Sequence, residues 1–325
     1  MGILTTTNLF SKTLILSSIV ASAMILSACG KKESESITLN IGFQKYGILP
    51  IVKERGVLEN ALKEQGVNIK WVEFPAGPQL LEGLNVGSVS FGESGEAPPI
   101  FAQAANSNLI YVANQPPAPD AEALIVPKNS KINSIQELKG KRIALNKGSN
   151  VHYLLVKLLE KNNIKLNEIN VVYLPPSDAR AAFERGAVDA WVIWDPFFAA
   201  AEQQIGARVI ATGKNVVNNY QFYLADRQFA EKHPQILQSI VKELNTTTQW
   251  VSQHQDEAAK LLEKPTGLDF NILKTSISRM GFGVQPISPE VAKQQQYVAD
   301  AFYQEKLIPH QINIQAAILH NADSK

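Results

Sequence analysis

Two hydrophobic periods alternate along the chain from residue 37 onward. In the segment 37–43, apolar residues occupy every second position, which is the pattern of a half-buried strand, whereas segment 79–84 has helical spacing. The same reading predicts strands at 37–43, 67–71, 89–92, 109–113, 123–126, 141–146, 171–174, 188–194 and 207–211. Strands that alternate with helices indicate βαβ units and mainly parallel sheets.

A proline-rich segment, 114–120, separates two such units, and long helices follow residues 220–224. We read both segments as crossovers between two lobes. The predicted fold class is therefore α/β, with two mainly parallel sheets, helices on both faces of each, and a ligand cleft between the lobes. The predicted division assigns residues 37–122 and 224–325 to lobe 1 and residues 123–223 to lobe 2. Within lobe 2, Ser134 and Glu137 fit a capping box.

The first 36 residues have a different character. Residues 1–28 carry one charged side chain, Lys12, and an apolar run at 14–26 that is shorter than the roughly 20 residues of a spanning helix. This is the pattern of a signal peptide. The segment 26–29, Leu-Ser-Ala-Cys, resembles a bacterial lipobox, which implies cleavage before Cys29 and lipid attachment to its thiol. The alternatives are an ordinary secretory signal cut near Ala28 and a buried cysteine in an N-terminal helix.

If Cys29 carries lipid, residues 29–36 form a short tether, and the protein is anchored on the periplasmic side of the cell membrane or envelope. Lysine and arginine number 31 and the acidic residues 30, so a net charge of +1 gives no electrostatic reason to expect a nucleic acid partner. A single cysteine excludes an intrachain disulfide and a cysteine-based zinc cluster. We expect neither a metal nor a cofactor.

Candidate ligand contacts are found where strands end, because open α/β sheets bind ligands beyond the carboxyl ends of their strands. The first turn holds Gln44, a double hydrogen-bond donor, together with Tyr46. The second holds Ser94 and Gly95, whose hydroxyl and backbone amides can bind an oxyanion, and Glu96. The Glu96 carboxylate can cap its own helix or pair with a cationic ligand tail.

Two further turns lie in the second predicted lobe. Ser149 and Asn150 follow a glycine at a predicted helix start, which makes this turn the best anion site in the sequence. Ser149 can equally be a plain helix cap, and His152 can be a ligand contact or a buried structural residue. In the fourth turn, Trp194 can pack on an organic group, and Asp195 can orient a ligand amine or cap the next helix.

Several long blocks carry a resemblance to a known family. They are FQKYG at 43–47, EFPAGPQLLEGLNVG at 73–87, GEAPPIFAQ at 95–103, NKGSNVHYLL at 146–155, DARAAFE at 178–184, VDAWVIWDPF at 188–197 and NYQFYLA at 219–225. The sequence between about 37 and 313 resembles the aliphatic sulfonate-binding lipoproteins and periplasmic proteins of ABC importers, in the taurine, nitrate and sulfonate group. Many of those proteins are simply secreted, so the Cys29 motif is a departure.

The resemblance implies a type II periplasmic-binding-protein-like fold, a monomer, uptake of alkanesulfonates as a sulfur source, and a membrane permease with its ATPase as partners. A sulfonate is a monoanion with three acceptor oxygens, which neutral donors at helix starts can satisfy. Trp194 and Tyr220 would then host the alkyl part. Arg180 can contact the anion or bridge the lobes.

Three other functions stay open. One is a binding protein for taurine, nitrate or a sulfate ester instead of an alkanesulfonate. Another is an enzyme like the pyrimidine-precursor synthases, which five scattered histidines without an HxxxH-like pair disfavour. The third, a purely structural lipoprotein, fits poorly with four donor-bearing turns at one cleft.

Overall fold

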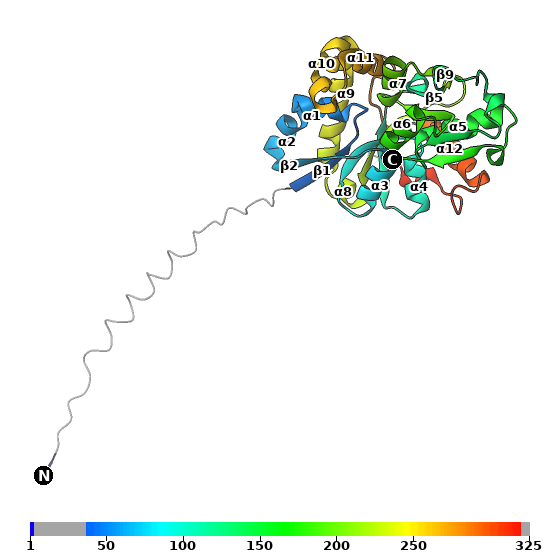
Figure 1. Ribbon diagram of the computed structural model, residues 1–325. Coiled ribbons are helices and arrows are strands. Elements are labelled where there is room, and N and C mark those ends of the chain that lie inside the picture. The colour runs from blue at the N-terminus through cyan, green and yellow to red at the C-terminus, as the bar shows by residue number, and fades with distance from the viewer. Residues whose placement is uncertain (3–36, 320–325) are drawn as a thin grey trace. The chain divides into compact units, whose positions relative to one another are not determined.

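Two five-stranded sheets form the folded part of the chain (Figure 1). This computed structural model describes residues 1–2 and 37–319, so the predicted signal peptide, Cys29 and the tether lie outside the described residues. The first sheet has the order β2-β1-β3-β10-β4. Its strands are β1 (Ile37–Phe43), β2 (Val67–Glu73), β3 (Phe91–Gly95), β4 (Leu109–Asn114) and β10 (Gln221–Asp226).

The second sheet has the order β7-β6-β8-β5-β9. Its strands are β5 (Glu122–Val126), β6 (Arg142–Leu145), β7 (Asn170–Tyr173), β8 (Ala190–Trp194) and β9 (Arg208–Thr212). In each sheet one strand, β10 or β5, runs antiparallel to both of its neighbours, and the other strands share one direction. The prediction of an α/β fold with two mainly parallel sheets is therefore confirmed.

Helices cover both faces of both sheets. We use lobe 1 for the first sheet with its helices α1 (Leu49–Arg55), α2 (Val57–Leu62), α3 (Gly77–Asn85), α4 (Pro98–Ala104), α8 (Arg227–Lys232), α9 (Pro234–Gln253) and α10 (Gln255–Thr266). We use lobe 2 for the second sheet with α5 (Asn150–Lys161), α6 (Pro176–Glu184) and α7 (Phe197–Ile205). The helices α11 (Phe270–Ser278) and α12 (Pro289–Gln304) contact both lobes. Short 3₁₀-helices occupy Lys63–Gln65, Pro119–Ala121, Ile135–Leu138, Leu166–Glu168 and Ile314–Ala317.

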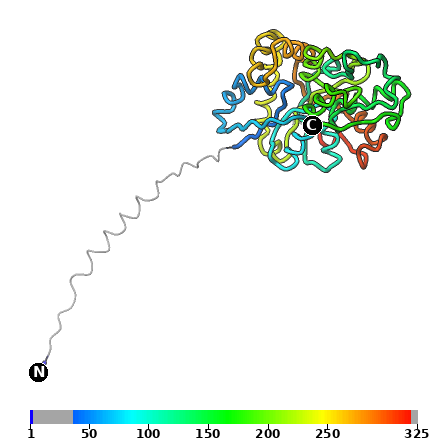
Figure 2. Tube along the Cα trace, viewed as in Figure 1, coloured from blue at the N-terminus to red at the C-terminus, as the bar shows by residue number. Residues whose placement is uncertain are grey.

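Alternate residues of the strands β4, β5, β8 and β10 enter different hydrophobic cores, as the period of two requires. In β10, Tyr223 joins the core under α1, α2 and α9, whereas Leu224 joins a second core. This second core also contains Leu124 and Leu154 of lobe 2, so one apolar cluster extends across both lobes. Figure 2 shows the C-terminal segment, in orange and red, beside the green segments of lobe 2. There Phe302 of α12 packs 5.7 Å from Tyr153 between ring centroids.

The chain changes sheets between β4 and β5 and again between β9 and β10. The two crossovers touch, because the Ala118 amide donates a hydrogen bond to the Asn218 carbonyl at 3.1 Å. The segment after α11 pairs with the end of β4 through the bridge between Asn114 and Gln285. The predicted lobe boundaries fall close to these crossovers, and the division at 122/123 and 223/224 remains our proposal.

The sequence reading did not predict strand β10, and two further local predictions differ from the structure. Strand β3 continues to Gly95, because antiparallel pairing with β10 places Ser94 opposite Phe222, so the predicted turn at this position is strand. The capping box also fails, because the Ser134 side chain makes no cap bond. The Glu137 carboxylate instead accepts from the Asn133 amide at 2.6 Å, at the start of a 3₁₀-helix.

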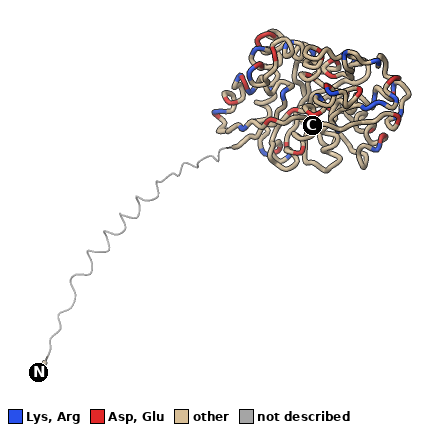
Figure 3. Tube along the Cα trace, in the orientation of Figure 1, with Lys and Arg blue, Asp and Glu red and all other residues tan. Residues whose placement is uncertain are grey.

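Charged residues of both signs are interspersed along the folded part, as Figure 3 shows. No helix among the described residues has the length and apolar character needed to cross a bilayer.

Candidate functional site

A cavity of about 420 Å³, including its part open to solvent, lies between the lobes. Lobe 1 contributes Gln44, Tyr46, Gly77, Ser94, Gly95, Pro98 and Gln221 to its wall. Lobe 2 and the crossovers contribute Ala121, Ser149, Asn150, Trp194 and Asn219. None of these lining residues carries a formal charge. The predicted residues Gln44, Tyr46, Ser94, Gly95, Ser149, Asn150 and Trp194 are thus brought together around one cavity.

The loop after β1 is fixed on strand β3 by a buried carboxylate. Glu93 accepts hydrogen bonds from the amides of Ile48 and Leu49, each at 3.2 Å, at the start of α1. Gln44 Nε2 donates to the Glu93 carbonyl at 3.2 Å. A Cβ on Gly47 would lie 2.0 Å from Glu93 Oε1, and the φ of Gly47 is 105°, so this position requires glycine. Desolvation raises the pKa of Glu93 to about 8.

A buried hydroxyl group lies on the lobe 1 side of the cavity. Ser94 Oγ is fully buried and has no hydrogen-bond partner among the described residues. A Cβ on Gly77 would lie 2.4 Å from this oxygen and 2.7 Å from Pro98 Cγ. Glycine at the first position of α3 therefore leaves the Ser94 hydroxyl room at the cavity wall. A buried polar atom without a partner costs free energy, which a hydrogen-bonding ligand can recover.

The lobes meet at Asn150 on the other side of the cavity. Its Oδ1 accepts from the Ala97 amide at 3.1 Å, and its Nδ2 donates to Asn219 Oδ1. Asn219 in turn donates to the Ala118 carbonyl at 2.8 Å. A Cβ on Gly95 would lie 2.1 Å from Asn150 Nδ2. The contact is so close that only glycine at position 95 permits this approach of the two lobes.

Two helices begin at the cavity without a side-chain cap. Ser149 precedes α5 with extended backbone, but its hydroxyl donates to the Asn146 carbonyl at 2.7 Å rather than accepting from the helix. The role of Ser149 as a plain helix cap is thereby excluded. Helix α3, which starts at Gly77, also lacks a side-chain cap bond. The positive ends of both helix dipoles therefore lie at a cavity with uncharged walls, which is a favourable environment for an anion.

The aromatic part of the wall consists of Tyr46 and Trp194. Both rings pack around Ala118 and Ala121, together with Met280. Burial, and secondarily the neighbouring Asp195, raise the pKa of Tyr46 well above its usual value. The phenol therefore remains protonated, as a neutral hydrogen-bond donor beside an apolar surface.

Glu96 and Tyr220 lie outside the wall of this cavity. Glu96 Oε2 accepts from the Tyr220 amide at 3.0 Å, so the carboxylate ties β3 to the second crossover rather than capping its own helix. Desolvation raises the pKa of Glu96 to about 7. The Tyr220 ring packs 5.9 Å from that of Phe222. A direct ligand contact by either residue remains a prediction.

His152 is buried in an aromatic cluster. Its Nδ1 lies 3.3 Å from the Gly148 amide, from which it accepts a hydrogen bond. Its ring lies 6.4 Å from Phe101 and 5.7 Å from Phe302 between centroids. Burial, assisted by Lys147, lowers the pKa of His152 to about 4, so the ring is neutral near pH 7. This environment favours the structural alternative over a ligand contact.

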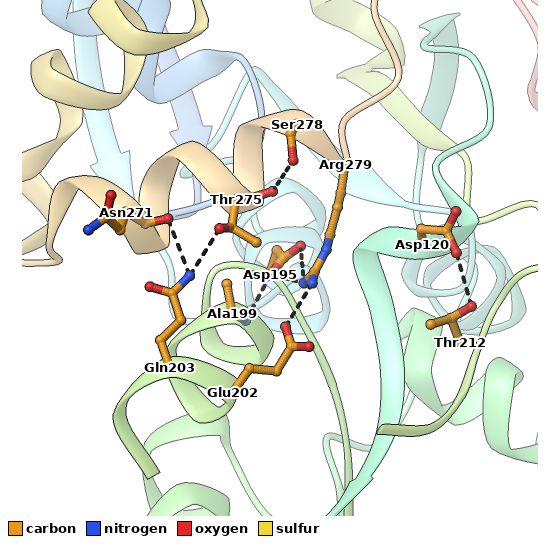
Figure 4. Close-up of polar contacts among 10 residues, drawn as sticks. All are labelled: Asp120, Asp195, Ala199, Glu202, Gln203, Thr212, Asn271, Thr275, Ser278 and Arg279. Atoms are coloured by element: carbon orange, nitrogen blue, oxygen red, sulfur yellow. Dashed lines mark hydrogen bonds and ion pairs between the residues drawn. The ribbon is translucent and has the colours of Figure 1, made fainter. Parts of the chain in front are cut away.

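Asp195 is also fully buried, and it joins lobe 2 to the segment after α11 (Figure 4). One oxygen accepts from the Ala199 amide at 3.0 Å, which caps the start of α7 as one alternative predicted. Arg279, which follows α11, lies 3.4 Å from both carboxylate oxygens and 2.7 Å from Glu202 Oε2. Desolvation raises the pKa of Asp195 to about 7 despite this cation. Asp195 thus pairs with the segment after α11, directly after a wall residue, Trp194.

Sequence reasoning missed the bridging arginine and part of the wall. Arg180, considered for an interlobe bridge, bonds instead to Glu184 and Gln204 inside lobe 2. The missed wall residues are Gly77, Asn219 and Gln221. They lie inside the family blocks at 73–87 and 219–225, which was the only sequence signal for them. Their position at the cavity depends on how the two lobes pack. No group of three metal-binding side chains gathers among residues 37–319.

Two sheets, two crossovers and an interlobe cavity at helix starts define a two-lobed solute-binding protein. The chain belongs to the NMT1/THI5-like family, whose model matches residues 47–258, and within it to the group of aliphatic sulfonate-binding proteins. It is 41% identical over 288 residues to the putative aliphatic sulfonates-binding protein of Escherichia coli, with 88% of this chain and 90% of that protein covered.

Two solved structures have the same fold. The alkanesulfonate-binding protein SsuA of Xanthomonas axonopodis pv. citri, bound to MOPS, superposes with a TM-score of 0.84 at 39% identity, covering 87% of this chain and 98% of that one. The periplasmic aliphatic sulphonate binding protein SsuA of E. coli gives 0.81 at 39% identity, covering 89% and 94%. The family resemblance found in the sequence is confirmed.

Proposed function

We propose that this chain is the substrate-binding lipoprotein of an ABC importer, which captures aliphatic sulfonates between its lobes and delivers them to the membrane permease. The observation that carries the proposal is the cavity, which has an uncharged wall, two uncapped helix starts and the unpaired Ser94 hydroxyl. The similarity to the E. coli and Xanthomonas proteins supports it, because MOPS is itself a sulfonate.

The charge of the wall favours a monoanion with a neutral tail. A sulfonate needs several hydrogen-bond donors but no full counter-charge. The amides at the two helix starts supply such donors, and so do the side chains of Gln44 and Ser94. The ammonium group of taurine would meet no carboxylate on the wall. Nitrate has no tail to cover Tyr46 and Trp194. A sulfate monoester also carries a tail and presents three anionic oxygens, and it is the alternative that the wall accommodates best.

The relatives are binding proteins, and the proposal assigns no catalytic residue and no cofactor to this chain. We infer that the mature protein is a monomer without a nucleic acid partner, held on the periplasmic side of the membrane by lipid on Cys29. The closed arrangement, with Asn150 on Ala97, is the form we expect the permease with its ATPase to recognise.

A thermal-shift panel tests the specificity. The mature chain is heated with hexanesulfonate, hexyl sulfate, taurine, nitrate or sulfate at equal concentration and ionic strength. We expect the largest rise in melting temperature with hexanesulfonate, because ligand binding to the folded state stabilises it. A larger rise with taurine or nitrate would contradict the assignment of the ligand class, and equal rises with all anions would indicate a nonspecific salt effect.

A further inference from the structure

Two buried acids lie where the crossovers between the lobes meet. Glu96 follows β3 in lobe 1 and is 1% exposed, whereas Glu122 is the first residue of β5 in lobe 2 and is fully buried. Glu96 Oε2 accepts from the Tyr220 amide at 3.0 Å, and the Glu122 carbonyl accepts from the Gly213 amide at 3.3 Å. Both acids are therefore tied to the second crossover, 213–220. We call the two acids and the crossovers 115–121 and 213–220 the hinge.

The two acid side chains belong to one apolar region. Because side chains alternate along a strand, Glu122 shares a face of β5 with Leu124, whose hydrophobic cluster also contains Tyr220. Glu96 is bonded to the backbone of that same tyrosine. Each lobe therefore contributes one carboxyl group to a region of low dielectric constant, where an unpaired charge is costly.

Three of the four side-chain oxygens of this pair have no donor. Glu96 Oε1 and both side-chain oxygens of Glu122 are buried without a hydrogen-bond partner among the described residues. No cationic side chain of residues 37–319 lies within ion-pair distance of either acid. Two buried carboxylates without donors or a counter-ion would cost too much free energy to persist, so the pair holds at least one proton.

The titratable groups around the pair do not replace that proton. They are Tyr46 of the loop after β1, Tyr153 of α5, Lys214 and Tyr220 of the second crossover, and Glu290 of α12. Lys214 is the one cation in this set, and it is exposed. Desolvation raises the pKa of Glu96 to about 7. Desolvation, and secondarily the charge of Glu96, raise the pKa of Glu122 well above its usual value.

Solvent comes close to the hinge on one side. A cavity of about 880 Å³, including its part open to solvent, borders Glu96, the second crossover, Tyr153 of α5 and Gln294 of α12. A movement of the crossovers widens this path from solvent to the acids. Hydration of a buried carboxyl group returns its pKa toward the ordinary value. The open form of the protein then releases a proton that the closed form holds.

We propose that Glu96 and Glu122 form a proton-holding pair that couples closure of the lobes to the uptake of a proton from solvent. When both acids ionise, two like charges from different lobes occupy one apolar region, which favours opening. This inference rests on the proposed function, because closure is driven by the bound sulfonate. It adds that the protein captures sulfonates more tightly in acidic surroundings.

The test is calorimetric titration of the mature chain with hexanesulfonate at pH 6 and at pH 8.5. The ligand is an anion at both values, so a change in affinity reports on the protein. We expect wild type to bind about tenfold more tightly at pH 6, because the closed form carries a proton that the open form lacks. At pH 7, titrations in imidazole and in phosphate, which differ in ionisation enthalpy, should show proton uptake on binding.

The variant Glu122→Gln removes one acid and leaves a neutral side chain of similar size. In this variant, and in Glu96→Gln/Glu122→Gln, the affinities at the two pH values should agree within about twofold. Glu257→Gln, which changes an exposed acid on α10, is the matched control and should keep the full difference. Circular dichroism shows that each variant is folded before titration.

The outcomes separate this inference from the proposed function. Loss of the pH dependence in both variants supports the pair. Equal wild-type affinities at the two pH values overturn it, and so does a pH dependence that survives in the double variant and disappears in Asp195→Asn; in both cases the proposed function stands. Failure of wild type to bind hexanesulfonate at either pH contradicts the proposed function and this inference together.

Discussion

Arg279 lies with its Nη1 3.4 Å from both carboxylate oxygens of Asp195, and this ion pair joins the segment after α11 to the end of β8 in lobe 2 (Figure 4). The same guanidinium stacks 4.1 Å from the centre of the Phe198 ring. Beside it, Gln203 of α7 donates to Thr275 of α11 at 2.9 Å. The contact lies one residue beyond Trp194, so the ion pair fixes the strand end that carries part of the cavity wall.

Replacing Arg279→Met should destabilise the fold and weaken sulfonate binding. Removal of one partner leaves the carboxyl group of Asp195 buried without its cation, at a cost of about 3 kcal/mol in the free energy of unfolding. Urea denaturation measures this loss. The double variant Arg279→Met/Asp195→Asn should recover much of it, because the buried acid is then also gone. Additive losses in the double variant would show that the two residues do not act as a pair.

Replacing Gly95→Ala should prevent closure of the lobes. The added Cβ would lie 2.1 Å from Asn150 Nδ2 and 2.2 Å from its Oδ1, so the contact between lobes must open. We expect sulfonate affinity to fall by roughly 100-fold, since the ligand can no longer be enclosed. Small-angle scattering should show no decrease in radius of gyration on adding ligand, unlike wild type. The double variant Gly95→Ala/Asn150→Ala should regain closure, and its failure to do so would place the obstruction elsewhere.

Glu96 links stability to pH, because burial raises the pKa of its carboxyl from 4.5 to about 7. Between these values the folded chain holds a proton that the unfolded chain has released. The contribution of protonated Glu96 to the free energy of unfolding is therefore fully present below pH 4.5 and is lost as the pH rises through 7. The slope approaches about 1.4 kcal/mol per pH unit within that window.

The variant Glu96→Gln isolates this effect, because its amide stays neutral and can still accept from the Tyr220 amide. Its free energy of unfolding relative to wild type should increase steadily as the pH rises from 4.5 to 7. Denaturation at several pH values measures the free energy of unfolding of the variant and of wild type. Other groups, such as His152, titrate in both proteins, so their effect cancels in the difference. A difference that does not change with pH would contradict the raised pKa.

Replacing Cys29→Ser tests the proposed anchor. Without the thiol, lipid cannot be attached, so the protein should lose palmitate labelling and move from the membrane fraction to the soluble fraction. Sulfonate affinity should not change, because the cavity is built within residues 37–319. Membrane association that survives the substitution would show that something other than lipid on Cys29 holds the protein.

Local patterns in the sequence were sufficient for most of the fold. The strand at 37–43 and helix α3 follow from periodicity, which depends on neighbouring residues alone. The predicted strand at 89–92 ends three residues before β3 does, because the last residues of β3 pair with β10, which lies far away in the sequence. Antiparallel pairing of this kind leaves no local signal.

In the candidate site, too, some residues have a local signal in the sequence and others do not. Gln44, Ser94 and Ser149 could be selected because each follows or ends a strand where the fold class places ligands. Arg279 could not be selected, because its importance comes from a buried acid in lobe 2 that no spacing in the sequence connects to it. The absence of charge on the wall was equally hidden, since it depends on Glu93, Glu96 and Asp195 turning to partners outside the cavity.

Calorimetric titration of the mature chain with hexanesulfonate, for wild type and for Ser94→Ala, tests the central claim most directly. We predict one binding site per chain in wild type and an affinity roughly 10- to 100-fold lower in Ser94→Ala, because the variant loses a hydrogen bond to a charged oxygen. Ser252→Ala, which changes an exposed hydroxyl on α9, should bind as wild type does. No binding of hexanesulfonate by wild type, or equal affinity in Ser94→Ala, would contradict the assignment of this cavity as the sulfonate site.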